Sequence, residues 1–256
     1  MTRGIGRFLL LGGLLVCICQ PAAAADISFV PERSIHERLP DSAHVQISGE
    51  ITDGDPVRLR VALALLAMAR SSNPMVVLDS PGGNVPAALE MGRILRESLA
   101  HTIVDRDGSC SSSCVFLLAG GVMRDLFLNG KIGLHRPRFD YEPYGGLSKD
   151  QAKAAYDALI GRCVDYMKEM GISEKVFSDM LRVPSQSIRF VDRDYANEQG
   201  LVGTDPGWEE WSRAKAIKSK GEARVKAGDR RLDCYNKGEL QWVCEARYKK
   251  DLDAIK

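Results

Sequence analysis

The chain has 256 residues, 45% hydrophobic, 27% charged and 7% aromatic, a composition typical of one globular domain with room for a small appendage. This composition excludes a disordered, collagen-like or repeat-array chain. Lys and Arg total 35 while Asp and Glu total 34, so the formal net charge of +1 argues against nucleic acid or an acidic membrane as the main partner.

The first 25 residues have the pattern of a cleavable secretory signal peptide. Arg3 and Arg7 precede an apolar run over residues 8–18, and a stretch of alanines ends at Ala25. The apolar run is too short for a permanent membrane span, although an uncleaved anchor is the alternative interpretation. Removal of this segment leaves 33 basic and 34 acidic groups. We therefore expect an exported, near-neutral protein of the periplasm or the extracellular space.

The next part of the chain alternates between strand and helix patterns. Strands are predicted at 44–51, 75–78 and 102–104, and helices at 55–69, 85–100 and 111–118. Pro56 suits the first turn of the first helix, and the sequence Ser-Pro-Gly-Gly-Asn at 80–84 ends the second strand. This succession predicts an α/β fold with a mainly parallel, buried sheet.

Beyond residue 120 the elements become shorter and the loops longer. The patterns predict strands at 125–128, 131–134 and 188–191, helices at 148–171 and 174–181, and a loop rich in Gly, Pro and Tyr at 136–146. Asn129-Gly130 is a turn signal between the first two of these strands, and Ser148 with Gln151 forms a capping box.

Three regions follow from these patterns: a signal peptide at 1–25, an α/β domain at 26–206, and a charged, mostly helical extension at 207–256. The extension carries no readable chemistry.

Five of the seven cysteines lie beyond the expected signal peptide, an odd number for an oxidising compartment, so at least one thiol is unpaired or masked by burial. Cys234 and Cys244 are predicted to form a disulfide in the polar extension, which would stabilise it by about 2 to 3 kcal/mol. Cys110 and Cys114 are expected to be small buried residues, because no second cysteine pair or histidine cluster completes a zinc site. Cys163 has no assignable partner.

Two loops follow the carboxyl ends of strands, where open α/β sheets place their sites. In Ser80-Pro81-Gly82-Gly83 the paired glycines let backbone N–H groups approach a ligand, although a tight turn before a helix has the same sequence. The segment 108–114 places three serines at the entrance of an apolar helix, where unsatisfied N–H groups favour negative charge. Serines that merely cap a helix are the alternative there.

His135 is the histidine best placed to act as a general base, because it ends a short strand and enters a loop. His36 lies in the polar N-terminal lead, whereas His44 and His101 stand at the starts of strands. An isolated histidine is more often structural, so its position relative to the two loops decides how it is interpreted.

In order and spacing these residues resemble the Clp protease proteolytic subunit, within the ClpP/crotonase superfamily. That family has a Ser-Pro-Gly-Gly turn before a helix, then a serine ahead of Phe-Leu-Leu-Ala, then His-x-Pro. The matching residues here are Ser80–Gly83, Ser112 with Phe116–Ala119, and His135–Pro137. Exported bacterial relatives carry a Cys-x-Ser-x-Cys segment, matched by Cys110–Cys114. The resemblance covers about Val45 to Val202.

The resemblance implies a superhelix of repeated β-β-α units followed by the helical extension. It implies Ser112 as nucleophile and His135 as its base, with the backbone N–H groups of Gly83 and Ser113 as an oxyanion hole. We expect a peptide or protein substrate, no cofactor and no metal, and a homo-oligomer built through the helix at 148–170. The ATP-driven unfoldase of cytoplasmic relatives is not an expected partner of an exported chain.

The third catalytic position departs from the family pattern. Ile188 stands where the family has an aspartate before an Arg-Phe pair, and an apolar side chain cannot orient the imidazole, a loss of about ten-thousandfold in the Ser-His-Asp template. A Ser-Lys dyad through Lys131 is disfavoured, because that side chain points away if His135 points in. The alternatives for the third partner are Asp192, Asp194, Asp179 or a backbone carbonyl.

The sequence therefore predicts an exported serine peptidase-like hydrolase that works by acyl transfer through a Ser-His pair. A ClpP-like binding or assembly protein with weak or no catalysis is the second hypothesis, motivated by Ile188. Crotonase-like acyl-CoA chemistry is a third, and export away from coenzyme A counts against it.

Overall fold

The computed structural model describes residues 24–31, 43–68, 74–137 and 146–255. The expected signal peptide lies outside these residues except for its last two positions, and most of the predicted loop at 136–146 also lies outside them. Within the described ranges, no helix combines the length and apolar character needed to cross a bilayer.

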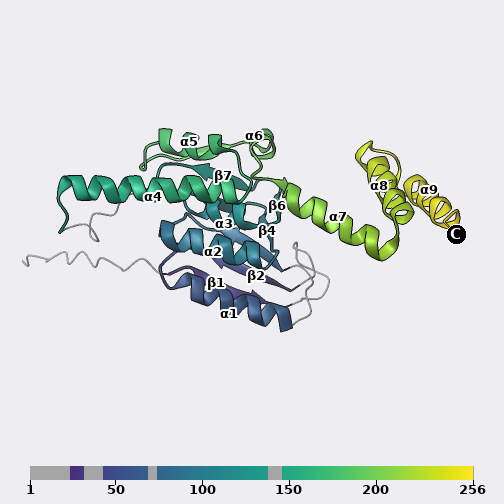
Figure 1. The fold of residues 1–256 in the computed structure, drawn as a ribbon, viewed down its shortest axis with the longest axis horizontal. Helices are drawn as coiled ribbons and strands as arrows, with labels where there is room; N and C mark the ends of the chain where they lie inside the picture. The colour runs from purple at the N-terminus through teal and green to yellow at the C-terminus, as the bar shows by residue number, and fades with distance from the viewer. Residues whose placement is uncertain (1–23, 32–42, 69–73, 138–145, 256) are drawn as a thin grey trace, which may run out of the picture.

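Two β-sheets organise the molecule (Figure 1). The larger sheet has the strand order β1-β2-β3-β4-β6-β9, in which β2, β3, β4 and β6 run parallel and the outer strands β1 and β9 antiparallel. Its strands are β1 (Asp26–Val30), β2 (His44–Ser48), β3 (Met75–Asp79), β4 (His101–Val104), β6 (Met123–Leu126) and β9 (Gly203–Thr204). In the smaller sheet, β7 pairs parallel with β5 and antiparallel with β8. The strands of the smaller sheet are β5 (Ser109–Ser111), β7 (Lys131–Leu134) and β8 (Arg189–Val191).

The helices surround these sheets and continue into an arm at the C-terminus. They are α1 (Asp55–Met68), α2 (Val85–Glu97), α3 (Cys114–Gly120), α4 (Lys149–Glu169), α5 (Glu174–Arg182), α6 (Arg193–Glu198), α7 (Pro206–Lys220), α8 (Glu222–Asn236) and α9 (Gln241–Asp253). In Figure 1, α7 leads away from the body and α8 and α9 stand apart from it. The predicted α/β fold with a mainly parallel sheet and C-terminal helices is confirmed.

The chain builds the body from repeated β-β-α units. β4, β5 and α3 make one complete unit, in which β4 joins the larger sheet and β5 the smaller. In the two preceding units the second strand is reduced to isolated bridges, Ile51 with Gly83 and Ser80 with Cys110. Because consecutive second strands lie side by side, each unit brings its short loop next to the loop of its neighbour.

Several local predictions differ from the structure. The strand expected at 125–128 lies at 123–126, and the helix expected at 85–100 ends at Glu97. The helix expected from residue 111 begins at Cys114, because Ser109–Ser111 pairs with β7 as β5. The turn at Asn129-Gly130 is present, with a φ of +68° at Asn129, but the strands on either side belong to different sheets. A sequence signal for a turn does not show which strand each flanking segment pairs with.

The core is centred on α3, whose residues are all buried. The Phe116 ring meets the edge of Tyr166 from α4 at 5.6 Å between centroids, and the Tyr166 hydroxyl donates to the Phe116 carbonyl at 2.7 Å. Burial raises the pKa of Tyr166, so the phenol remains a neutral donor. The capping box of Ser148 and Gln151 begins α4 as predicted. Helix α4 therefore holds α3, and with it the loop that precedes α3.

The extension is attached to the body by a partly buried group of ion pairs. Asp205 caps α7 by accepting from the Trp208 N–H, and its carboxylate also contacts Arg96 at 2.9 Å and Arg124 at 3.4 Å. The Arg124 side chain is only 3% exposed, and burial beside Arg96 lowers its pKa to about 10. This group fixes where α7 leaves the body.

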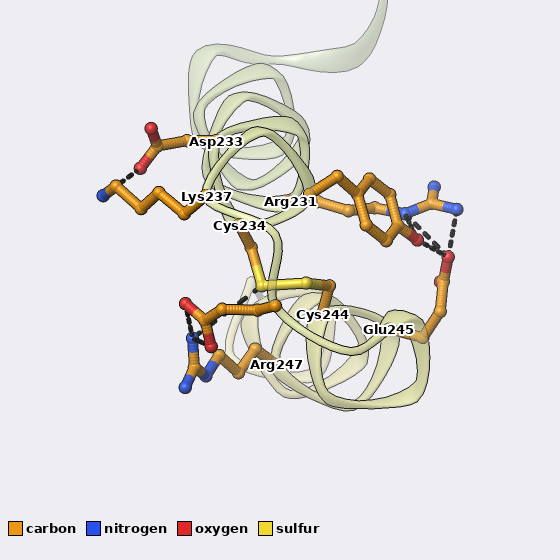
Figure 2. The surroundings of a disulfide bond; sticks show 9 residues. Arg231, Asp233, Cys234, Lys237, Cys244, Glu245 and Arg247 are labelled. Atoms are coloured by element: carbon orange, nitrogen blue, oxygen red, sulfur yellow. Dashed lines mark hydrogen bonds and ion pairs between the residues drawn. A yellow bond between two sulfur atoms is a disulfide. The ribbon is translucent and has the colours of Figure 1, made fainter.

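At the far end of the extension, a disulfide joins α8 to α9 (Figure 2). Cys234 and Cys244 form this bond, with 5.7 Å between their Cα atoms, and the predicted pair is confirmed. Ion pairs between Arg247 and Glu239 and between Arg231 and Glu245 flank it. Cys163 is free and buried in α4, which agrees with the expectation of one masked thiol.

A buried carboxylate, Asp179, connects α5 to the segment that follows it. It accepts from Lys175 at 2.6 Å, Arg182 at 2.7 Å and the Tyr195 hydroxyl at 2.8 Å, and it pairs with Arg189 at 3.6 Å. The hydrogen bond from Lys175, with those from Tyr195 and Arg182, lowers the pKa of Asp179 to about 2. Because the folded pKa lies below the ordinary value, this carboxylate stabilises the fold above about pH 4 and the stabilisation is lost towards pH 2.

We predict that Asp179→Asn lowers the free energy of unfolding by about 2 kcal/mol at neutral pH, because four donors and cations lose their anion. The wild-type stability should then fall more steeply than that of the variant between about pH 4 and pH 2, as measured by urea unfolding. Asp233→Asn, which breaks an exposed pair with Lys237, is the control and should cost less than about 0.5 kcal/mol. An equal loss for Asp179→Asn at both ends of this pH range would contradict the prediction.

Candidate functional site

A cleft of about 560 Å³ opens where the loops of successive β-β-α units meet. Its walls come from the loop after β2, the turn after β3, the turn after β5, the end of β7 and the segment before β8. The lining residues are Glu50, Ile51, Thr52, Asp53, Pro81, Gly82, Gly83, Asn84, Ser112, His135, Ser185, Gln186 and Ile188. Three of the predicted site residues, Ser112, His135 and Gly83, therefore line one cleft.

Ser112 occupies the sharp turn between β5 and α3. Its φ of +58° lies in the left-handed region, which a non-glycine residue adopts only where the surroundings enforce it. Its N–H donates to the Gly133 carbonyl at 2.9 Å, and its own carbonyl accepts from the Val115 N–H at 3.1 Å. A serine on a strained turn from a strand into a helix has the local geometry of a nucleophile elbow.

A disulfide between Cys110 and Cys114 encloses this turn. The two residues are buried, as expected, and the bond between them is a feature that the sequence did not predict. The left-handed residue between them folds the chain back so that their Cα atoms come within 5.2 Å, a separation that a disulfide spans readily. The sequence alone does not predict this bond, because two cysteines four residues apart can lie on several different backbone conformations.

The paired glycines bring the turn after β3 against the serine turn. Gly82 has a φ of +95°, and a Cβ there would lie 2.6 Å from the Ser112 Cβ and 2.8 Å from the Ser113 nitrogen. Gly83 has a φ of +146°, and a Cβ there would lie 2.2 Å from the Ile51 carbonyl oxygen. No larger residue fits at either position without displacing backbone.

The two amide groups expected to form an oxyanion hole lie on these adjoining turns. The Ser113 hydroxyl donates to the Gly83 carbonyl at 3.1 Å, which ties the turns together. Within the described part of the chain, neither the Gly83 N–H nor the Ser113 N–H donates to a protein acceptor. Ile51 pairs with the residues on either side of Gly83, so the Gly83 N–H turns away from Ile51. Gly83 lines the cleft, whereas Ser113 is buried and is not among the residues that line it.

His135 follows β7, two residues beyond the Gly133 that pairs with Ser111. Its half-buried ring has Nδ1 at 3.0 Å from the Arg136 carbonyl oxygen. If Nδ1–H donates to that oxygen, Nε2 is left with a lone pair to accept a proton. Among the described residues, no hydrogen bond joins Ser112 to His135, although both line the cleft.

None of the carboxylates considered as a third partner lines the cleft. Asp192 caps α6 by accepting from the Tyr195 N–H, Asp194 lies in the first turn of that helix, and Asp179 is held by its own cluster. Ile188 does line the cleft, and its Cγ2 would be 2.7 Å from a Cβ placed on Gly133. The position that carries an aspartate in the family thus faces the site without a carboxylate.

Lys131 stands outside the cleft, at the exposed start of β7. Its ammonium group lies 5.7 Å from the centroid of the Phe190 ring. Within the described residues, no group of three His, Cys, Asp or Glu side chains is arranged to hold a metal ion.

Sequence reasoning missed several residues of the cleft. Glu50 and Asp53 follow β2, and Ser185 and Gln186 belong to the segment between α5 and β8. No motif marked these residues, and the parallel pairing of β2 with β3 is what brings the first pair to the site. Aligning successive β-β-α units along the sequence would have placed Ile51 opposite Gly83, and Glu50 therefore beside the glycine turn.

Comparison with known proteins agrees with this architecture. The sequence model of the Clp protease family matches residues 31–153. The ATP-dependent Clp protease proteolytic subunit 3 of Synechococcus sp. (strain CC9605) is 29% identical over 178 residues, which are 66% of this chain and 84% of that protein. An α/β body of β-β-α units that carries these motifs in register is similar to that of the Clp proteases. These matches support a ClpP/crotonase-like fold for this chain, and its similarity there is to the Clp proteases.

Two solved structures of mutant forms of the 1510-N membrane-bound stomatin-specific protease are also similar. One is 16% identical with a TM-score of 0.47, covering 64% of this chain and 80% of that one. The other, in complex with a substrate peptide, is 17% identical with a TM-score of 0.48, covering 61% of this chain and 71% of that one.

Proposed function

We propose that this protein is a serine peptidase that cleaves peptides by acyl transfer at Ser112. The observation that carries the proposal is that Ser112, His135 and Gly83, which come from three successive units, line one cleft. The strained turn at Ser112 and the two unbonded amides support it. Similarity to the Clp proteases makes a peptide the first substrate class to test.

In the proposed mechanism, Ser112 Oγ attacks the peptide carbonyl carbon while His135 Nε2 takes the hydroxyl proton. The tetrahedral oxyanion is held by the N–H groups of Gly83 and Ser113, each worth about 3 to 4 kcal/mol in comparable sites. His135 then gives its proton to the leaving amine as the C–N bond breaks. Water attacks the acyl-enzyme by the same route in reverse, which frees Ser112.

The role that the aspartate has in a Ser-His-Asp triad is taken here by the Arg136 carbonyl, which faces Nδ1 of His135. A carbonyl oxygen sets the tautomer but carries no full negative charge, so it stabilises an imidazolium less than a carboxylate does. We therefore expect slow turnover, and covalent labelling is a more sensitive assay than peptide hydrolysis.

A binding or assembly protein with the same fold is the second candidate function. Ile188, apolar and on the cleft wall, is the specific observation that favours it. The two candidates differ in one property, because only the peptidase has a nucleophilic hydroxyl at Ser112.

The proposal extends to the export and assembly of the protein. We propose that the chain enters the periplasm or the extracellular space after cleavage following Ala25, and acts there without an ATP-driven unfoldase on flexible peptides. Assembly as a homo-oligomer through α4 belongs to the same proposal, and light scattering on the mature chain measures it.

We predict that a fluorophosphonate probe labels the mature chain on Ser112, and that Ser112→Ala abolishes the labelling. His135→Ala should slow labelling at least about a hundredfold, because the hydroxyl loses its base. Asp192→Asn is the matched control and should label at the wild-type rate, since its carboxylate caps α6 outside the cleft. Labelling that is absent, or that persists in Ser112→Ala, would refute the peptidase.

The role of position 188, where the Clp protease pattern has an aspartate, can be tested by a gain of activity. Ile188→Asp places a carboxylate on the cleft wall that His135 also lines, and should raise the labelling rate about tenfold or more by stabilising the imidazolium. Ile188→Asn, with the same shape and no charge, should give less than a twofold change. Equal rates for the two variants would mean that position 188 does not act on His135.

A further inference from the structure

The disulfide between Cys110 and Cys114 joins two elements that meet at Ser112. Cys110 is the middle residue of β5, and Cys114 is the first residue of α3. Their Cα atoms are 5.2 Å apart, whereas a fully extended segment of the same length would span about 13 Å. The bond therefore excludes the open forms of the turn and leaves Ser112 inside a small closed ring.

The strand at one end of this ring is held along both of its edges. β5 pairs with β7 on one side, and on the other side the Ser80 N–H donates to the Ser109 carbonyl at 2.7 Å. The Ser111 N–H in turn donates to the Ser80 carbonyl at 3.0 Å. At the other end of the ring, every residue of α3 is buried. Because both ends are held, a change within the ring has to be taken up by the turn between them.

The two sulfur atoms have no spare room around them. Neither cysteine has exposed surface, and the Gly82 backbone packs directly against the turn. Two thiols that are not bonded must lie further apart than two bonded sulfur atoms, because their van der Waals radii then apply. A reduced pair is therefore accommodated only if the turn opens. A non-glycine residue adopts a φ such as the +58° of Ser112 only where it is enforced, so we expect Ser112 to leave that conformation when the bond is absent.

We infer, on the basis of the proposed peptidase function, that the Cys110–Cys114 bond positions the Ser112 hydroxyl, and that Ser112 is reactive only in the oxidised chain. The two cysteines are positioning residues, since they act through the backbone of the turn and do not belong to the lining of the cleft. A displacement of about 1 Å in a reacting group can cost roughly a hundredfold in rate, so a small opening of the turn is enough to suppress the reaction.

Formation of the bond takes two electrons and two protons from the two thiols. A small disulfide such as oxidised glutathione is the oxidant. One cysteine thiolate attacks it and releases one glutathione, the second thiolate attacks the resulting mixed disulfide and releases the other, and each released glutathione takes up one proton. Because both sulfur atoms are buried in the folded chain, this exchange has to occur before α3 packs. The redox conditions during folding therefore set the reactivity of Ser112.

A chain with one remaining pair of cysteines isolates this bond. The other three cysteines of the mature chain are changed in the combined variant Cys163→Ala, Cys234→Ala and Cys244→Ala. The denatured, reduced chain is refolded either with oxidised glutathione or with reduced glutathione alone, and mass spectrometry identifies the oxidised form by its loss of two hydrogen atoms. The oxidised form should take the fluorophosphonate label on Ser112 at least about tenfold faster than the reduced form.

Amide hydrogen exchange reports the conformation of the turn in the same two forms, independently of any chemistry at Ser112. The Ser112 N–H donates to the Gly133 carbonyl at 2.9 Å, and the Val115 N–H donates to the Ser112 carbonyl at 3.1 Å. Both amides should exchange at least about tenfold faster in the reduced form, whereas the amides of β3 should be unchanged. Dithiothreitol added to the folded oxidised chain should alter neither the labelling nor the exchange, because the bond is buried.

Substitution provides a matched comparison in the otherwise unaltered chain. Cys110→Ala combined with Cys114→Ala should slow labelling at least about tenfold. Cys234→Ala combined with Cys244→Ala removes the disulfide of the extension instead, and should label within about twofold of the wild type. Urea unfolding of each variant shows whether the body is folded under the labelling conditions.

The failure of this inference can be told apart from the failure of the peptidase. Equal labelling of the oxidised and reduced forms would overturn the positioning role and leave the peptidase standing. A reduced chain that does not fold would also overturn the positioning role, since the bond would then stabilise the whole body rather than the turn. Labelling of neither form would refute the peptidase. In that case faster exchange in the reduced form would still support the positioning of the turn by the bond, and equal exchange would overturn it too.

Discussion

The contact on which the rest of the site depends is the approach of the Gly82 backbone to the turn that carries Ser112. A single Cβ on Gly82 would come within 2.8 Å of three atoms of that turn. Only a residue without a side chain permits this distance. The Ser113 hydroxyl, which donates to Gly83, closes the contact from the other side.

Several other features hold that contact in place. The left-handed conformation of Ser112 is a strain of roughly 1 to 3 kcal/mol that the surroundings must offset. The Cys110–Cys114 disulfide closes the loop around the turn, the Gly133 carbonyl accepts its N–H, and α3 beyond it is buried by the Phe116–Tyr166 contact. The serine turn is thus held by interactions on both sides of Ser112, which restricts where its hydroxyl can lie.

The sequence predicted those parts of this arrangement in which a local pattern has one structural meaning. The helix cap at Ser148, the apolar strands and the glycine turn were readable because each depends on its own neighbours. The Cys110–Cys114 bond, the pairing of β7 with β5 and the Arg136 carbonyl at Nδ1 of His135 were not specified, because each depends on backbone direction in three dimensions. The family motif predicted which residues share a cleft, and Ile188 marked where this chain departs from it.

The most direct measurement of the central claim is a crystal structure of the mature chain treated with a peptide boronic acid, which forms a tetrahedral adduct with a nucleophilic serine. The account predicts a bond from boron to Ser112 Oγ, with one boronate oxygen within about 3 Å of the Gly83 and Ser113 nitrogens. It also predicts that His135 Nε2 faces the second oxygen and that Nδ1 still faces the Arg136 carbonyl. An unmodified Ser112, or an adduct whose oxygen lies away from both amides, would contradict it.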